Sequence, residues 1–290
     1  MQVVPTTGRA ELTPFEDAVD RLELAVAAPV VIQRLLATIA DPRSSVRDVE
    51  AVLTVDPSLV MRVLKLASSA VYARRPVRDL GGAIRTVGLH ELRRLAVTAH
   101  FATGKSPLAR ELWAYSLAVA FACERLALIG RPPPGPDLFL CGLLHDIGTL
   151  VLDRLLGERY ARLAIVPGDG RQADLERAAF GFDHTDLGAM AVARWNLFPE
   201  LEPVVQLHHD PFAADRLGLP AASQAAIELV ALARLGFLTT SEVLTDGEPA
   251  EVDLAVALAG RRGVTMDQAC DCAEEGRAQA AAVLGALTAA

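Results

Sequence analysis

Helix start signals recur along the chain, and they constrain its fold more than any other feature. The segments Thr13–Glu16 and Ser45–Asp48 each place a hydroxyl residue three positions before a carboxylate, which is the pattern of a capping box. The pairs Asp56-Pro57 and Ser106-Pro107 each place a capping side chain before a proline, and proline is tolerated at the first helical position because its missing N–H needs no partner there. These signals predict helices that begin near residues 14, 46, 57 and 107.

The apolar pattern agrees with helices and gives no sign of strands. After Asp56 the apolar residues mostly follow the i, i+3, i+4 spacing of a helix with one buried face: Leu59, Val60, Val63, Leu64 and Leu66. No run of β-branched and aromatic residues alternates with period two between turn signals. The aromatic share of 5% is also low for a β-sandwich or a barrel. The sequence therefore predicts an all-α protein.

Two changes in composition divide the predicted helices. The segment Gly130–Pro136 contains four prolines and cannot continue a helix. After about residue 240 the chain becomes acidic and rich in alanine. The predicted organisation is an N-terminal extension (1–23), an N-terminal helical lobe (24–105), a second helical lobe (106–240) and an acidic C-terminal helical extension (241–290).

The formal net charge of −8 is unevenly distributed. The last 50 residues hold nine acidic and three basic residues, a net charge of −6, whereas residues 62–94 hold eight basic and two acidic residues, a net charge of +6. The basic stretch is either a solvated helix face or a docking surface for an anionic ligand, an acidic protein or the chain's own acidic tail. The candidate docking residues are Arg74, Arg75, Arg78, Arg85, Arg93 and Arg94.

Several classes of protein are disfavoured by composition. Four cysteines in 290 residues cannot form a disulfide scaffold, so a reducing cytoplasm is the expected location. Charged residues, prolines and glycines interrupt the apolar runs before the ~18 residues that a bilayer crossing needs, so we expect no membrane span. Glu11, Glu16 and Asp17 interrupt any signal-peptide core. The negative net charge makes binding to nucleic acid unexpected.

The string Gly142–Gly148 is the most specific in the sequence. It places His145 beside Asp146 after an apolar helix, and an imidazole with a carboxylate can bind a divalent metal. A His-Asp pair alone is weak evidence, because such a histidine is more often a hydrogen-bonded core residue. The later His184 and the pair His208-His209 strengthen the interpretation as a metal site, because four of the six histidines are then candidate ligands.

The order of these and several other segments along the chain resembles that of the HDOD (HD-related output domain) family, a degenerate branch of the HD superfamily. The matching segments are Glu111–Ser116, Gly142–Gly148, Glu176–Ala189, Trp195 and His208-His209, with Asp56–Leu59, Leu64–Tyr72 and Ala83–Gly88 in the earlier half. Ser68 departs from the asparagine that the family usually shows. The likeness covers about residues 24–240 and implies a two-lobed helical fold, in which residues 106–240 form a degenerate HD-like lobe.

The resemblance also implies that the metal site is damaged. HD phosphohydrolases use a first His, the His-Asp pair and a later Asp to hold one or two metals, which generate a hydroxide nucleophile. Here Tyr115 takes the place of the first His, and Arg234 takes that of the later Asp. A guanidinium has no lone pair to donate and repels a cation. We therefore expect Asp146 to pair with Arg234 in a salt-bridged core.

A residual ligand set remains in His145, Asp146, His184 and either His208 or His209. Imidazoles with one carboxylate suit iron, manganese or zinc. The alternative is that no cofactor binds and that these side chains join helices through buried hydrogen bonds, because each would cost ~1–3 kcal/mol if left unpaired.

The resemblance implies a non-catalytic regulatory protein of bacterial signal transduction, acting through contacts with an unidentified signalling partner, including pathways that involve cyclic dinucleotides. The alternative is an enzyme, a metal-dependent phosphohydrolase (phosphodiesterase) acting on a nucleotide or cyclic dinucleotide. Two further hypotheses concern residues 62–94: docking of the acidic tail onto this stretch, and binding of nucleic acid with an affinity that falls steeply with salt.

Overall fold

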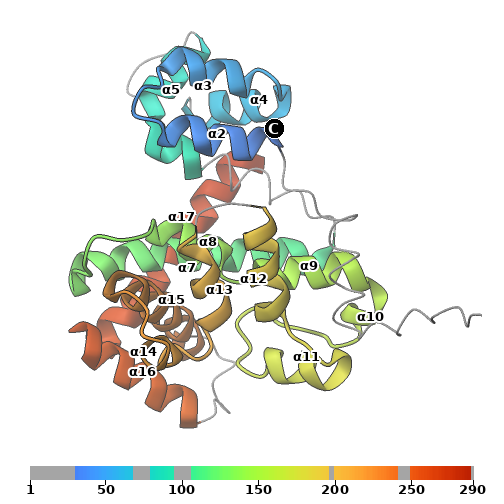
Figure 1. Cartoon of the computed structure of the whole chain (residues 1–290), viewed down its shortest axis with the longest axis vertical. Helices are drawn as coiled ribbons and strands as arrows, with labels where there is room; N and C mark the ends of the chain where they lie inside the picture. The colour runs from blue at the N-terminus through green and yellow to red at the C-terminus, as the bar shows by residue number, and fades with distance from the viewer. Residues whose placement is uncertain (1–29, 68–78, 95–105, 196–198, 241–248, 289–290) are drawn as a thin grey trace, which may run out of the picture.

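The chain folds into helices. The computed structural model describes residues 30–67, 79–94, 106–195, 199–240 and 249–288, and every regular element within these ranges is a helix. Figure 1 shows a small upper lobe and a larger lower lobe. The predicted all-α, two-lobed fold is confirmed. The predicted N-terminal extension, with its helix near residue 14, lies outside the described residues.

The upper lobe is built from the N-terminal helices. They are α2 (Val30–Ala40), α3 (Val46–Leu53), α4 (Pro57–Ala67) and α5 (Leu80–Val87) (Figure 1). α3 follows a capping box in which the backbone N–H of Ser45 donates to the Asp48 carboxylate at 2.7 Å. α4 begins at Pro57, so both predicted starts are confirmed. The inward-facing side chains include Leu35, Leu53, Val63 and Ile84.

The lower lobe contains the remaining helices. They are α7 (Pro107–Gly130), α8 (Leu138–Leu144), α9 (Ile147–Leu156), α10 (Glu158–Ala161), α11 (Gln172–Phe180), α12 (His184–Arg194), α13 (Leu201–Leu207), α14 (Ala213–Arg216), α15 (Ala221–Thr240), α16 (Pro249–Arg262) and α17 (Met266–Thr288). The Ser106 hydroxyl accepts a hydrogen bond from the backbone N–H of Ala109 at 2.9 Å, and Pro107 occupies the first turn. The predicted start of α7 is thus confirmed.

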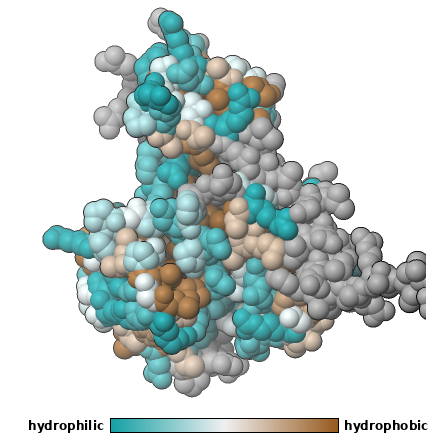
Figure 2. Space-filling model, viewed as in Figure 1, coloured by the Kyte–Doolittle hydropathy of each residue, from teal (hydrophilic) through white to brown (hydrophobic). Residues whose placement is uncertain are grey.

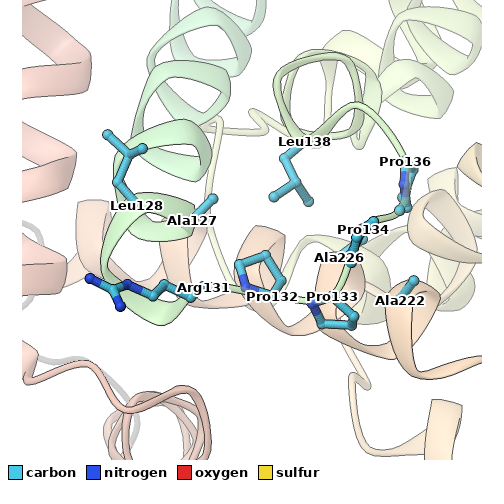
Figure 3. Close-up of a pocket in the computed structure, with 11 residues that line it drawn as sticks. Ala127, Leu128, Arg131, Pro132, Pro133, Pro134, Pro136, Leu138, Ala222 and Ala226 are labelled. Carbon is cyan, nitrogen blue, oxygen red and sulfur yellow. The ribbon is translucent and has the colours of Figure 1, made fainter.

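The proline-rich segment connects α7 to α8 inside the lower lobe. α7 ends where Arg131 adopts a left-handed conformation, with φ of 43°. Figure 3 shows a pocket beside this segment, lined by its prolines and by Leu128, Leu138 and Ala222. The segment therefore turns the chain within one lobe.

α7 is the described helix that bears on the expected absence of a membrane span. Among the described residues it is the helix long and apolar enough to cross a membrane by length and composition. More than half of its most apolar stretch is buried within the structure, where it contacts α8, α15 and α17. The central helix of an all-α lobe passes the same test, so the finding is weak evidence for a membrane span.

The C-terminal helices are part of the lower lobe. α17 packs along α7 so closely that a Cβ atom at Gly276 would overlap the carbonyl oxygen of Ala118. Glu275 of α17 forms an ion pair with Arg125 of α7. Figure 1 shows α17 reaching up to the upper lobe, where it contacts α4. The acidic C-terminal extension is therefore helical, as predicted, and bridges the two lobes.

Docking of the acidic tail onto the basic stretch stays a prediction. Arg74, Arg75 and Arg78 lie outside the described residues. The contact between α17 and α4 brings the tail to the lobe that carries the stretch, but the ion pair of Glu275 goes to α7.

Candidate functional site

The histidines and the aspartate found in the sequence lie at helix ends. His145 directly follows α8, Asp146 precedes α9, His184 begins α12 and His208 directly follows α13. Gly148 allows α9 and α12 to meet, because a Cβ atom there would overlap the carbonyl oxygen of His184. Four helix ends thus converge on one point, and the residues predicted from the sequence are brought together. With His209, these residues are called the histidine cluster below.

Asp146 lies at the centre of the histidine cluster. Its Oδ1 atom is 3.4 Å from Nε2 of His184 and 3.3 Å from Nε2 of His208, and its Oδ2 atom is 3.2 Å from Nε2 of His145. All four side chains are buried, with Asp146 3% exposed and the three histidines 0% exposed. The carboxylate is therefore enclosed by imidazole nitrogens instead of solvent.

Two of these imidazoles turn a bare nitrogen toward Asp146. The Nδ1–H group of His145 donates to the carbonyl of Gly142 at 2.7 Å, and that of His208 donates to the carbonyl of Val205 at 2.9 Å. A neutral ring protonated at Nδ1 has a lone pair at Nε2. Nε2 of His145, Nε2 of His208 and Oδ1 of Asp146 are accordingly buried without a hydrogen-bond partner. Three hydrogen-bond acceptors that face one another repel, so a positive charge between them would stabilise this arrangement.

Glu176 orients the third histidine. Its Oε2 atom accepts hydrogen bonds at 2.7 Å from both the backbone N–H and Nδ1 of His184. Its Oε1 atom accepts one from Nε2 of Gln172 at 2.9 Å and one from the hydroxyl of Tyr160. Glu176 is fully buried, and it holds the Nε2 atom of His184 toward Asp146. A carboxylate behind a histidine in this way is typical of metal sites.

His209 supplies a further nitrogen. Its Nε2 atom lies 3.1 Å from Nε2 of His184. One ligand atom from each of Asp146, His184, His208 and His209 falls within 4.8 Å of the others. The donor set fits iron, manganese or zinc, and these residues would hold such an ion. A proton on His184 supplies a positive charge as well, because it would face both Glu176 and Asp146.

We expect the free energy of unfolding to fall as the pH is lowered from 7 to 4.5. Burial lowers the pKa of His208 from 6.5 to about 4 and holds that of His209 well below its usual value. Both residues take up protons in the unfolded chain at a pH where the folded state resists them, so acid favours unfolding. For His208 alone the loss is on the order of 3 kcal/mol at most.

His184 acts in the opposite direction. Burial alone would lower its pKa, but the hydrogen bond and charge of Glu176 outweigh burial and raise it. Stability from His184 is therefore present in acid and lost as the pH rises through its folded pKa. Urea unfolding at pH 7, 5.5 and 4.5 measures the balance, with exposed His90→Gln as the control. Stability that stays constant over this range would contradict the assignment.

Tyr115 lies beside the histidine cluster. Its ring centroid is 5.9 Å from that of His145, and its hydroxyl oxygen is buried without a hydrogen-bond partner. Burial raises the pKa of its hydroxyl, so the phenol is neutral at physiological pH. A neutral phenol is a poor substitute for an imidazole as a metal ligand.

The expected pairing of Asp146 with Arg234 is wrong. Arg234 is 2% exposed, and both its Nη1 and Nη2 atoms lie 3.4 Å from Oε1 of Glu251. Glu251 belongs to α16, a part of the chain that sequence reasoning treated as an acidic tail. The physical reason is that three imidazoles already surround Asp146: burial alone would raise the pKa of this carboxyl, but the same rings, when they carry a proton on the nitrogen that faces it, hold its pKa well below the usual value.

Sequence reasoning also missed Glu176 as a site residue. It lies inside the segment that carried the family resemblance, but its role depends on how α11 packs against α12.

A buried guanidinium calls for an acidic partner. Arg234 in the apolar stretch Ile227–Leu235 was therefore a signal that could have pointed to Glu251.

The described arginines of the candidate docking surface have partners within the chain. Arg85 lies 3.9 Å from Asp79, and Arg93 lies 3.7 Å from Asp137. Arg94 pairs with Glu91 and Glu124, and its guanidinium stacks 4.3 Å from the ring centroid of Phe139. Arg94 is only 8% exposed, so its charge joins the lobes instead of facing an external anion.

Comparison with known proteins places these features in context. A family model described as HDOD domain matches residues 26–211. A protein of Treponema pallidum (strain Nichols), described as uncharacterized, is 24% identical over 204 residues, which make up 66% of this chain and 39% of that protein. The chain therefore spans about two fifths of the length of this relative.

Solved structures show the same fold. An HDOD domain protein of unknown function from Geobacter sulfurreducens is 24% identical, with a TM-score of 0.64 over 92% of this chain and 96% of that chain. A protein of Shewanella amazonensis SB2B, provisionally named a phosphohydrolase, is 23% identical, with a TM-score of 0.67 over 95% and 98%. A provisionally named signal transduction protein of Marinobacter aquaeolei VT8 is 20% identical, with a TM-score of 0.69 over 98% and 63%.

Proposed function

Because the chain belongs to the HDOD domain family, we propose that it is a regulatory protein of bacterial signal transduction that acts through contacts with a partner protein and catalyses no reaction. The burial of the histidine cluster carries this proposal, since Asp146 and three histidines are almost completely enclosed. A catalytic metal keeps an open coordination position for water or substrate. These four side chains offer no such position to solvent, and among the residues of the histidine cluster only His209 is partly exposed.

The residues around the histidine cluster support the same conclusion. Tyr115 and Arg234 stand at the two positions where the resemblance to HD phosphohydrolases expects metal ligands. Arg234 is a permanent positive charge in a buried setting, and its charge contributes to lowering the pKa of His209, after burial and His208. The same field disfavours a divalent cation. A protonated His184 between Glu176 and Asp146 balances the buried carboxylates without a metal.

Contacts with a partner require an available surface. Large apolar side chains are more than half exposed on both lobes: Val55 and Met61 on the upper lobe, and Leu128, Leu217 and Val256 on the lower lobe. Figure 2 shows hydrophobic residues among hydrophilic ones on the visible face of both lobes. Single exposed apolar residues are common on monomers, so these side chains are compatible with docking and do not locate it. None of the four cysteines, all of which the structure describes, forms a disulfide, which supports a cytoplasmic location.

The proposal is tested by comparing the wild-type chain with a His145→Ala/Asp146→Ala variant. Protein purified without chelator is analysed for iron, manganese and zinc, and is then assayed with bis(p-nitrophenyl) phosphate and with cyclic dinucleotides. We expect the two proteins to show the same background hydrolysis, because neither offers a metal an open position. Hydrolysis by the wild type that exceeds the variant at least about tenfold, together with stoichiometric metal, would refute the proposal.

A metal-dependent phosphohydrolase is the second candidate, favoured by the unpartnered acceptors of His145, Asp146 and His208. When bound, a metal would supply a water molecule of lowered pKa as a nucleophile. Asp146, His184, His208 and His209 would hold it, and Glu176 would fix the ring of His184. Hydrolysis of a phosphodiester in the experiment above, lost in the double variant, is the outcome that this candidate predicts.

A further inference from the structure

The first turn of α16, Pro249–Val252, is tied to the body of the lower lobe by Glu251. This carboxylate forms the ion pair with the buried Arg234 of α15, and it also lies directly against the backbone of Gly170, where a Cβ atom would overlap it. α16 lies outside the residues 26–211 that the family model matches. The first turn of α16 therefore packs against α15 and against the loop between α10 and α11.

That loop covers the histidine cluster on the Tyr115 side. Gly168 adopts a φ of +87°, and a Cβ atom at this position would lie 3.0 Å from the hydroxyl oxygen and from Cζ of Tyr115, so the backbone packs against the hydroxyl end of this ring. Tyr115 in turn faces His145. An unbroken series of contacts therefore connects Glu251, through the loop and Tyr115, to the histidine cluster.

We propose that the ion pair between Arg234 and Glu251 is a latch that holds the first turn of α16 closed over the histidine cluster, and that release of this turn exposes the cluster. This regulation rests on the proposed function, in which the site is closed in the folded protein. Arg234 occupies a position where the resemblance expects a metal ligand, so the latch replaces a metal contact with a contact to the C-terminal extension.

The two ends of α16 are held differently. At its last turn, Arg261 and Arg262 both pair with the fully buried Glu228 of α15, and Arg261 also pairs with Asp215. At its first turn, Glu251 contacts the backbone of Gly170 and pairs with Arg234, whose Nη1 and Nη2 atoms each lie 3.4 Å from its Oε1 atom. These distances are longer than those of a strong charge-assisted hydrogen bond. The first turn can therefore separate while the last turn stays anchored.

Separation of the first turn leaves most of the helix packed. The fully buried apolar residues Ala255 and Leu258 lie one and two turns further along α16. Opening the first turn does not require them to leave the core. It does leave the guanidinium of Arg234 buried without its acidic partner, and this unpaired charge opposes opening.

The test measures access to the histidines with diethyl pyrocarbonate, which acylates uncharged imidazole, followed by mass spectrometry of each histidine. In the wild type, exposed His90 reacts fast, and the fully buried His145 and His208 react slowly. In Glu251→Gln we expect His145 and His208 to react at least about tenfold faster than in the wild type. Arg234→Gln removes the same pair from the other side and should give the same result.

Glu228→Gln is the matched control, because it removes the α15 carboxylate that pairs with Arg261 and Arg262 at the opposite end of α16. It should leave His145 and His208 protected. The latch is refuted if both Glu251→Gln and Arg234→Gln, with helix content equal to wild type by circular dichroism, react as slowly as the wild type. It is also refuted if Glu228→Gln opens the cluster equally, because the effect is then a general loosening of α16.

The latch and the proposed function fail in different ways. Phosphodiesterase activity of the wild-type protein would overturn the closed, non-catalytic site whatever the reactivity of Glu251→Gln. An inactive wild type with unchanged reactivity in Glu251→Gln and Arg234→Gln would overturn the latch and leave the proposed function standing.

Discussion

Replacing Gly148 by alanine is expected to lower the free energy of unfolding by about 3 kcal/mol. A Cβ atom at Gly148 would overlap the carbonyl oxygen of His184 and would also press on the backbone N–H of Gly188. Both neighbours are backbone atoms of α12, so relief requires α9 and α12 to move apart. The midpoint of thermal unfolding should fall by roughly 6–12 °C, measured by circular dichroism.

The matched control is Gly260→Ala in α16. No heavy atom lies within 4 Å of the Cβ position there, and the residue is helical and exposed. Alanine is the better helix former by about 1 kcal/mol, so this change should stabilise the protein slightly. If Gly148→Ala stabilises the protein to the same extent, α9 and α12 do not meet as described.

Replacing Glu176 by alanine is expected to cost about 4 kcal/mol in the free energy of unfolding. The buried carboxylate accepts hydrogen bonds from the backbone and ring of His184, from Gln172 and from Tyr160. The change leaves these donors unpaired in a dry interior and removes the negative charge that raises the pKa of His184. Urea unfolding at pH 7 measures the loss.

Asp174→Ala is the control for Glu176→Ala. Asp174 lies on the same helix, α11, with its side chain 86% exposed and an ion pair to Arg177. An exposed pair of this kind contributes ~0–1 kcal/mol, so the control should differ little from the wild type. Equal losses in the two variants would mean that the network around Glu176 is not buried and continuous.

The fold was predictable because its signals are local. Ser45–Asp48, Pro57 and Ser106-Pro107 mark helix starts through bonds within a single turn, and the structure places α3, α4 and α7 at these residues. The histidine cluster was also predictable, but for another reason: the order of its motifs matches that of a family whose fold brings them together.

The partners of the buried charges were not predictable in the same way. Arg234 and Glu251 are 17 residues apart in the sequence. Nine acidic residues follow residue 240, and the sequence does not show which of them is the partner of the buried Arg234. The family resemblance suggested Asp146 as the partner of Arg234, whereas in the structure Arg234 pairs with Glu251. Such pairs depend on how α15 and α16 pack, and no periodicity within either helix encodes that choice.

The packing of α17 along α7 bears on how the protein is made. α7 is the most membrane-like helix of the described chain, and α17, which covers one of its faces, is the last element that the ribosome synthesises among those described. At about 5–20 residues per second, the covering helix emerges many seconds after α7. During that interval the apolar face of α7 is open to aggregation, and a chaperone bound to nascent chains would find its target there.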